Sequence, residues 1–336
     1  MSELRLGIIG CGGFVRSHVR AINECVPEVK VAALVDVNPA NIQRLRKECL
    51  PRKRPKVFDS HKEMLKEVKP DAVIVSTPHT LHYRHCSDAL KAGAHVMVEK
   101  PMVTDSDDAR KLVAQADKAG RNLQIAIQGL YTDTFAYARK LMADGTIGEL
   151  QLATGIMAQG WMKGTAGKWR QDPKLSGGGQ LYDSSAHVLS AMMYLVDSPV
   201  EEVFCWADNK GTRVDINAVA CVRFANGCMA SITSGGNCPG SMYSQLILQG
   251  DGALVEIRPH GGGFRVNNKK EDLEITKVPR GWKIPTVPPV RNFVDVILGK
   301  AEPRCTGQLG ILLADLMDAL YDSIEKGKPV RPPRRG

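Results

Sequence analysis

The first residues able to do chemistry lie in a glycine cluster near the N-terminus. Gly10, Gly12 and Gly13 directly follow a short apolar run at residues 4–9. Glycines at a turn from strand to helix let backbone N–H groups approach a pyrophosphate, and the helix dipole favours an anion there. Val15 replaces the third glycine of G-x-G-x-x-G, so the motif alone also fits a mere tight turn. Its place after the first strand of an alternating chain favours a dinucleotide-binding loop.

Asp36 is a second candidate, at the end of an apolar run over residues 29–35. An acid at this distance from the glycine turn can accept hydrogen bonds from a ribose diol, although it can also cap a turn or helix. No basic residue directly follows it to hold a 2′-phosphate, and a carboxylate would repel that group. The sequence therefore favours NAD over NADP, while Arg44 and Arg46 on the next predicted helix leave NADP as the less favoured cofactor.

The elements that must position these residues alternate along the first part of the chain. Apolar runs predict strands at residues 4–9, 29–35, 57–58, 71–75, 94–98 and 123–127. Stretches between them predict helices that end near residue 25 or span 39–49, 60–68, 81–92 and 105–119. Nearly all-apolar strands separated by such helices indicate a parallel sheet covered on both faces. The predicted fold class is α/β, with an N-terminal Rossmann doubly wound parallel sheet in a domain at 1–128.

After residue 128 long strand-like segments dominate. Predicted strands span 149–158, 201–207, 217–224, 228–234, 244–249 and 254–257, and predicted helices span 134–143, 181–195, 289–298 and 308–326. Asn226-Gly227 and Asp251-Gly252 are strong hairpin signals. These features predict a C-terminal α+β domain at 129–328 with a large, mainly antiparallel sheet, followed by a loose basic tail at 329–336.

Composition and charge disfavour several classes of protein. The chain has 336 residues and a net charge of +9, which a basic patch between Arg44 and Lys56 and the arginines of the tail account for. That patch contains no aromatic residue, and no helix-turn-helix, zinc-finger or RNP pattern occurs, so a solvated surface is favoured over nucleic-acid binding. No apolar run approaches the ~20 residues that span a bilayer, and the first residues do not resemble a signal peptide. We expect a cytoplasmic protein with no membrane partner.

The cysteines and histidines do not form a metal-binding pattern. Nine cysteines are scattered without a CxxC pair, and Cys221 and Cys228 lie in apolar runs, which predicts reduced, mostly buried thiols. His79, His82 and His85 are close in sequence, but their spacing does not keep all three on one helical face. No metal is expected.

Three further motifs resemble one known family. Glu99-Lys100-Pro101 follows the fifth predicted strand, and Ser76-Thr77-Pro78-His79-Thr80-Leu81-His82 follows the fourth. Residues 177–187 read GGGQLYDSSAH, which is similar to the pattern GGGxLxDxGxH. Together these motifs resemble the Gfo/Idh/MocA oxidoreductases, which include sugar and cyclitol dehydrogenases.

The resemblance implies that Lys100 lies beside the nicotinamide and that Asp183 and His187 come from the second domain. Oxidation of a carbinol needs a base for the hydroxyl proton while hydride leaves to the cofactor. His187 suits that role because imidazole titrates near neutral pH, and Asp183, four residues earlier on the predicted helix, would orient it. Lys100 would polarise the substrate oxygen, and which of Lys100 and His187 takes the proton stays open.

Motifs and resemblance together give two sets of binding residues. The cofactor-binding set is Gly10, Gly12, Gly13, Phe14, Asp36, Thr77, Pro78, His82, Glu99, Lys100 and Gln128. The substrate-binding set is His79, Tyr131, Trp161, Lys168, Trp169, Arg170, Asp183 and His187. Aromatic faces stack on sugars, and cationic groups bind hydroxyls or anions. Trp169 is equally suited to anchoring its loop to the core.

The sequence also departs from the family pattern. Ser185 and Ser190 stand where members commonly have a glycine and an acid, Leu130 where they often have an arginine, and His79 where asparagine is frequent. These departures predict a substrate pocket unlike that of a standard inositol dehydrogenase.

We therefore expect an NAD-dependent oxidoreductase acting on a secondary alcohol of a sugar, glycoside or cyclitol. A redox-neutral glycosidase or lyase is the alternative, in which NAD transiently oxidises a ring carbon before elimination and return of the hydride. A non-catalytic NAD-sensing or polyanion-binding protein is disfavoured by the set Lys100, Asp183 and His187. By resemblance, two or four copies would pair through the open face of the antiparallel sheet, as a homodimer or homotetramer.

Overall fold

The computed structural model describes residues 3–260, 263–268 and 278–332. The chain forms two compact units, Met1–Ile127 with Val287–Gly310 and Gln128–Thr286 with Ile311–Gly336. The expected boundary after residue 128 stays a prediction. Residues 287–310, which the sequence assigned to the C-terminal domain, group instead with the first unit.

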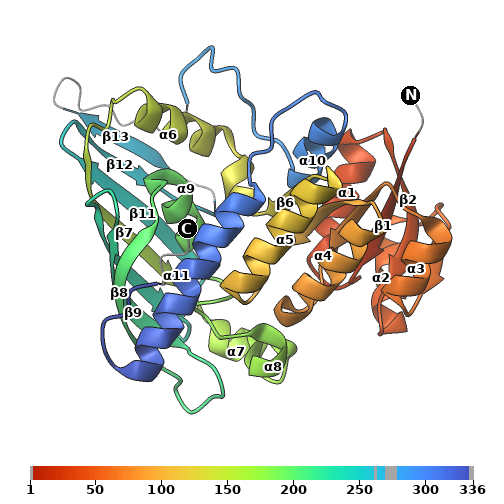
Figure 1. Ribbon diagram of the computed structural model, residues 1–336, viewed down its shortest axis with the longest axis horizontal. Helices are drawn as coiled ribbons and strands as arrows, with labels where there is room; N and C mark the ends of the chain where they lie inside the picture. Colours follow the sequence, from red (N-terminus) through yellow and green to blue (C-terminus); the bar gives the residue numbers. More distant parts are fainter. Residues whose placement is uncertain (1–2, 261–262, 269–277, 333–336) are drawn as a thin grey trace. The chain divides into compact units, whose positions relative to one another are not determined.

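The first unit contains the parallel sheet that the sequence predicts (Figure 1). Its strands are β1 (Leu4–Ile9), β2 (Val29–Val35), β3 (Lys56–Phe58), β4 (Ala72–Val75), β5 (His95–Glu99) and β6 (Leu123–Ala126). Their order, β3-β2-β1-β4-β5-β6, is that of a doubly wound dinucleotide-binding fold. In such sheets ligands bind at the carboxyl ends of the strands where the order reverses, here beyond β1, β2 and β4.

Three of the helices described in this unit begin at side-chain caps that the sequence supplies. The described helices are α1 (Val15–Cys25), α2 (Pro39–Cys49), α3 (His61–Val68), α4 (His82–Lys91), α5 (Ser106–Ala119) and α10 (Pro289–Ile297), with a 3-10 turn η1 (His79–Leu81) before α4. The side chains of Asn38, Ser60 and Asp105 accept hydrogen bonds from the first turns of α2, α3 and α5. Gly120 ends α5 in the left-handed conformation.

Helix α10 returns to the first unit because it completes that unit's core. Phe293 and Val294 pack in one buried cluster with Val15 and Val19 of α1, and Figure 1 shows α10 beside α1. The Asn292 side-chain oxygen accepts a hydrogen bond of 2.6 Å from Gln124 of β6. Nothing in the local pattern of α10 reveals which sheet it will cover.

The second unit contains a sheet of seven strands. They are β7 (Leu150–Ala158), β8 (Val200–Asp208), β9 (Asn217–Phe224), β10 (Met229–Gly235), β11 (Tyr243–Gly250), β12 (Ala253–Ile257) and β13 (Phe264–Asn268), in the order β13-β12-β11-β7-β10-β9-β8. All neighbours are antiparallel except β7 and β10, which are parallel. The predicted mainly antiparallel sheet is confirmed, and β13 is a strand that the sequence analysis did not predict.

The helices of the second unit are η2 (Gln128–Tyr131), α6 (Asp133–Ala143), α7 (Trp161–Thr165), η3 (Trp169–Gln171), α8 (Pro173–Ser176), α9 (Ala186–Val196) and α11 (Gly307–Lys326), whose first turn belongs to the first unit. The helix predicted from residue 181 begins only at Ala186. The backbone N–H groups of Gln180 and Leu181 bond Asp215 instead, so the chain turns there before the helix starts.

The seven-stranded sheet has one covered and one open face. Helix α9 covers the first, where Val188 and Met192 lie against Gly155 of β7 (Figure 1). On the other face the side chain of Trp206 is 65% exposed, and Val219 next to it in register is exposed as well.

Cys221 lies on the open face and is exposed, so the expectation of a buried thiol is wrong at this position. Residues of β9 alternate between buried and exposed, and Cys221 falls on the exposed phase. Cys228 is buried, as predicted.

The C-terminal tail is tied down over its described part, which corrects the expectation of a loose segment. Val330 and Val203 exchange backbone hydrogen bonds of 2.9 and 2.8 Å. Arg331 lies 3.2 Å from a carboxylate oxygen of Glu202. The edge strand β8 offers unpaired backbone groups that an extended tail can satisfy. Arg334 and Arg335 lie outside the described residues.

Among the helices that the structure describes, none combines the length and the apolar character that crossing a membrane requires.

Candidate functional site

The glycine turn of the first unit has the shape of an anion-binding loop. Gly10 has a φ of +92°, and a Cβ there would lie 2.4 Å from the carbonyl oxygen of Ser76, so only glycine fits between β1 and β4. A Cβ at Gly12 would have no neighbour within 4 Å among the described residues, and one at Gly13 would approach only the Arg16 side chain at 3.8 Å. Phe14 stands at the N-cap of α1 without a side-chain hydrogen bond to the helix. This open turn before a helix N-terminus fits the pyrophosphate of a dinucleotide.

Asp36 fixes this turn from the end of β2. One carboxylate oxygen accepts the backbone N–H of Cys11 at 2.7 Å, and the other accepts that of Asn38 at 2.8 Å. The Asn41 side chain donates to both oxygens at 3.2 Å. Asp36 is half-buried, so part of the carboxylate remains open to a ligand. The arrangement fits the predicted role toward a ribose diol and also has the turn-capping role that the sequence left open.

Cys11 is a feature of this turn that the sequence analysis did not single out. Its side chain is buried against the end of β2, and burial, followed by the charge of Asp36, raises the pKa of the thiol to about 12. The Cys11 thiol is therefore uncharged at physiological pH, and its role in the turn is packing.

The segment after β4 is held by histidines. His82 is completely buried, and its two ring nitrogens lie 2.8 Å from the carbonyl oxygen of Pro101 and 2.9 Å from that of Thr77. Burial lowers the pKa of His82, while both carbonyl contacts favour the protonated ring. The Thr77 hydroxyl lies 3.0 Å from Nδ1 of His85. His82 thus links the backbone at the predicted cofactor residue Thr77 to the backbone at Pro101, with both of its nitrogens already engaged.

His79 begins the 3-10 turn η1, with its ring buried against that of His82. His79 in η1 and His82 and His85 in α4 therefore lie on two consecutive helical elements. No group of three or more His, Cys, Asp or Glu side chains able to hold a metal occurs in the part of the chain that the structure describes.

Glu99 and Lys100 end β5 at the same edge of the sheet as the glycine turn. Oε1 of Glu99 lies 2.5 Å from Nε2 of His18, and both side chains are buried. Lys100 is half-buried, and the peptide bond to Pro101 is cis. Glu99, which the motifs and the resemblance assign to the cofactor, therefore contacts His18 of α1. His18 was missed, although its place on the buried face of α1 beside Val15 and Val19 was a readable signal.

The triple glycine of the second unit is required by close packing. Gly177 has a φ of +77°, and a Cβ at Gly178 would lie 2.2 Å from the hydroxyl of Tyr321. A Cβ at Gly179 would lie 1.9 Å from the backbone oxygen of Asp215. The chain from Gly177 to Gly179 therefore has no room for side chains where it meets Tyr321 and Asp215.

Asp215 and Tyr321 hold this turn, and the sequence analysis named neither. The buried Asp215 carboxylate accepts the backbone N–H groups of Gly179 at 2.7 Å and Leu181 at 2.8 Å. The Tyr321 hydroxyl donates to the same carboxylate at 2.5 Å. Burial, followed by the charge of Asp215, raises the pKa of Tyr321 well above its usual range. Asp215 interrupts the apolar sequence Val214 to Ile216, which was the available signal.

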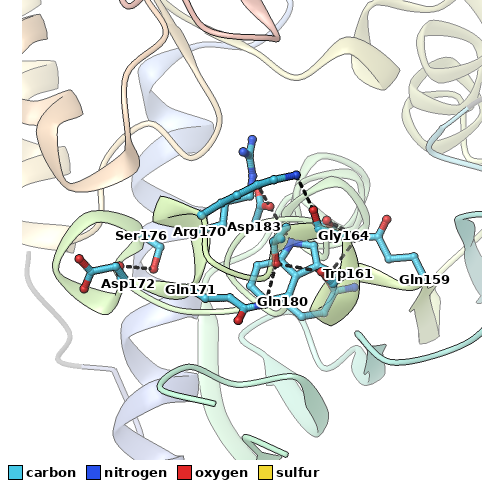
Figure 2. Close-up of polar contacts among 12 residues, drawn as sticks. Gln159, Trp161, Gly164, Arg170, Gln171, Asp172, Ser176, Gln180 and Asp183 are labelled. Atoms are coloured by element: carbon cyan, nitrogen blue, oxygen red, sulfur yellow. Dashed lines mark hydrogen bonds and ion pairs between the residues drawn. The ribbon is translucent and has the colours of Figure 1, made fainter. Parts of the chain in front are cut away.

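Asp183 lies in the turn before α9 and is buried. Its Oδ2 accepts hydrogen bonds from the indole nitrogen of Trp161 at 2.8 Å and from Nε of Arg170 at 2.9 Å (Figure 2). The prediction that Asp183 and His187 share one helical face is wrong, because α9 begins at Ala186, after Asp183.

His187 lies in the first turn of α9 and is half-buried. Its ring packs edge to face on that of His260, with centroids 4.0 Å apart. The loop carrying His260 is fixed by Gly129 of η2, where a Cβ would lie 2.2 Å from the carbonyl oxygen of Pro259. His260 is exposed and far from His187 in sequence, so spacing could not reveal this pair.

The remaining predicted substrate residues differ in exposure. Tyr131 is fully buried, whereas Gln128, predicted for the cofactor, is exposed. Lys168 is exposed and donates to the carbonyl oxygen of Gly164 at 2.7 Å. Trp169 is half-buried under the guanidinium of Arg170, 4.5 Å from its ring centre. Their roles toward a substrate stay predictions.

The family departures also have structural counterparts. The hydroxyl of Ser185, at one of these departures, lies 2.7 Å from that of Ser234. Ser190, at another, has a buried hydroxyl without a hydrogen-bond partner among the described residues.

Comparison with known proteins agrees with these two units. Residues 4–127 match the oxidoreductase family with an NAD-binding Rossmann fold, and residues 135–256 match the GFO/IDH/MocA C-terminal domain. The chain belongs to the Gfo/Idh/MocA family. It is therefore an oxidoreductase with an NAD-binding Rossmann domain, as the resemblance implied.

Two curated relatives and one solved structure illustrate the likeness. D-glucoside 3-dehydrogenase of Escherichia coli K12 is 32% identical, over 98% of this chain and 97% of that protein. Inositol 2-dehydrogenase of Paracoccus denitrificans is 31% identical, over 43% of this chain and 42% of that protein. The WlbA dehydrogenase of Bordetella pertussis, solved with NADH and UDP-GlcNAcA, has a TM-score of 0.85 at 23% identity and covers 100% of this chain and 99% of its own. At that identity the structural likeness shows the fold.

Proposed function

We propose that this protein transfers hydride between NAD and a secondary alcohol of a sugar, glycoside or cyclitol. The observation that carries the proposal is the 32% identity to a D-glucoside dehydrogenase over nearly the whole chain. The first unit supports it with an open glycine turn fixed by Asp36, and the second supports it with Asp183 and His187 around the start of α9.

The residues of the chain divide the chemistry between them. When bound, NAD supplies the hydride acceptor. His187, a half-buried imidazole, removes the hydroxyl proton of the substrate, and Lys100 polarises the same oxygen through its positive charge. Lys100 remains the alternative base. Asp183 contributes a fixed negative charge to the substrate-binding side.

We further propose NAD over NADP as the cofactor. The carboxylate of Asp36 is already anchored by the N–H groups of Cys11 and Asn38, so it cannot turn away from an adenosine ribose. A 2′-phosphate beside it would face a fixed like charge.

Pairing of copies through the open sheet face is part of the proposal. Trp206, Val219 and Met229 are large apolar side chains exposed on that face, and Tyr243 and Leu152 extend it. Contiguous exposed apolar side chains mark interaction surfaces in soluble proteins. A homodimer, or a tetramer of such pairs, would cover them. The nine free cysteines support a reducing compartment, and we propose the cytoplasm.

The first test is to denature the purified protein and identify any nucleotide that it releases. Polyols and glycosides are then supplied with excess NAD while NADH absorbance is followed, for the native protein, His187→Asn, Lys100→Met and the control Lys163→Ala. The proposal expects NADH formation that both site variants reduce at least 100-fold and the exposed control leaves unchanged.

Two results would overturn this proposal. Release of aglycone without net NADH, with solvent deuterium in the product, would identify the redox-neutral glycosidase instead. Ligand binding that Lys100 and His187 variants leave intact, with no turnover of any compound, would identify a binding protein.

A further inference from the structure

The segment between β7 and the triple glycine is folded into α7, η3 and α8. Gln171 braces it by donating to the carbonyl oxygen of Met162 at 2.7 Å and to the Thr165 hydroxyl at 2.9 Å. The backbone N–H of Met162 bonds the carbonyl oxygen of Gly236 at 2.7 Å, which ties α7 to the end of β10. These contacts give the segment a fixed shape.

Trp161 begins α7 and is only 4% exposed. Its indole packs with Val214 and Ile216 in a small buried cluster. Its one polar group, the indole N–H, is directed at Oδ2 of Asp183. A ring packed in this way is poorly placed for the sugar stacking that the sequence suggested.

Arg170 reaches the same oxygen from η3. Its Nε donates to Oδ2 of Asp183, and the guanidinium plane lies over the ring of Trp169. Figure 2 shows Trp161 and Arg170 approaching Asp183 from the folded segment. Oδ2 therefore receives two donors, one of them charged, and charge-assisted bonds are the stronger kind.

We propose that Trp161 and Arg170 are positioning residues, a clamp that holds the Asp183 carboxylate in one orientation as an anion during turnover. The inference rests on the proposed function, because it assumes that Asp183 meets the substrate. Two donors on one oxygen disfavour rotation of the carboxylate and protonation at that oxygen. Asp183 then acts as a fixed charge, which leaves proton removal to His187 or Lys100.

The clamp also explains why a folded segment precedes the triple glycine. Asp183 stands in a turn and not in a helix, so its own backbone gives little control of the side chain. The two donors come from outside that turn and supply the missing constraint. A misplacement of about 1 Å at a reacting centre can cost about 100-fold in rate.

The test compares Trp161→Phe, which keeps an aromatic ring but removes the N–H together with part of the indole, with Arg170→Gln and Arg170→Lys. We expect Trp161→Phe and Arg170→Gln to lower kcat by about 10- to 100-fold with KM within about threefold, following the cost of misplacement. Arg170→Lys, which keeps the positive charge, should have a kcat between those of Arg170→Gln and the native protein. Arg170→Gln should also shift the acidic limb of the pH–kcat profile. Lys163→Ala, an exposed change in the same helix, serves as the matched control.

A purely structural role would lower Tm without moving the pH profile, and a direct substrate contact would raise KM while kcat is kept. Either result overturns the proposal.

A second readout does not need activity. Tm is measured for Trp161→Phe, Asp183→Ala and the double variant, and the clamp predicts that the two single losses do not add, since both remove the same bond. Additive losses would show that the bond is absent in solution. A native protein that turns over no sugar would overturn the proposed function and the kinetic role with it, while the Tm cycle would still test the clamp.

Discussion

Replacement of Asp36 tests the cofactor assignment most directly. The carboxylate now accepts the N–H groups of Cys11 and Asn38 and the side-chain amide of Asn41. In Asp36→Asn one oxygen becomes an NH₂ group, which can no longer accept from Cys11 or from a ribose hydroxyl on that side. The variant keeps the size of the side chain and removes its charge.

The size of the effect follows from these contacts. A hydrogen bond to a charged group is worth about 1.5–3 kcal/mol, so loss of one ribose bond weakens NAD binding about 10- to 150-fold. NADP changes in the opposite direction. Two unit charges about 4 Å apart repel by about 4 kcal/mol at the effective dielectric of a protein surface, and the variant removes that repulsion. The preference for NAD over NADP should therefore fall by at least 100-fold.

Calorimetric titration of nucleotide-free protein with NAD and with NADP measures both affinities. Asp59→Asn is the matched control, because Asp59 directly follows β3, the neighbour of β2, and is exposed. It should leave the Kd for NAD within twofold. Unchanged Kd values for both nucleotides in Asp36→Asn would refute the ribose assignment. Equal weakening of both would show that Asp36 acts only by shaping the glycine turn.

Three other predictions address packing, chemistry and assembly. Gly179→Ala places a Cβ 1.9 Å from the backbone of Asp215. Overpacking of this kind lowers the free energy of unfolding by about 1–3 kcal/mol, which is a Tm loss of about 1–4 °C at this chain length. The control Gly164→Ala, whose Cβ has no neighbour within 4 Å among the described residues, should lower Tm far less. In the Trp206→Glu background, where no second copy covers the open face, Cys221 should be the first thiol to react with a disulfide reagent, and adding Cys221→Ser should remove that fast phase, while burial and a pKa of about 12 keep Cys11 unreactive in the folded protein; a fast phase that survives the change would contradict the exposed face. Trp206→Glu should convert an oligomer into monomers in light scattering, and an unchanged mass would show that copies pair elsewhere.

The fold was largely predictable because its signals are local. Apolar strands, helix caps such as Asn38 and Asp105, and hairpin dipeptides each act within a few residues. The predicted start of α9 was wrong because the chain at residues 180 and 181 is held in a turn by a distant residue, Asp215, whose backbone oxygen accepts from Gln180 and whose carboxylate accepts from Leu181. The course of α10 was missed for the same reason, since only the finished core of the first unit shows where it packs.

The site was predictable in its residue types and much less in its partners. Motifs pointed to Asp183 and His187, but nothing in their spacing indicated Trp161, Arg170 or His260 beside them. Such neighbours come from segments whose proximity depends on the sheet register and on turns between strands. The sequence alone shows which chemical groups are present, but not the contacts that orient them.

Two acids in this chain show how environment separates a binding group from a structural one. Asp36 and Asp215 both accept backbone N–H groups of a glycine-rich turn, so by type and by local role they are equivalent. Asp215 also accepts the Tyr321 hydroxyl and is only 4% exposed, so burial leaves it no surface for a ligand. Asp36 is half-buried, and it borders the turn where Gly12 leaves open space. The same interaction thus fixes the turn in both units, and solvent access distinguishes Asp36 as the acid that remains open to a ligand.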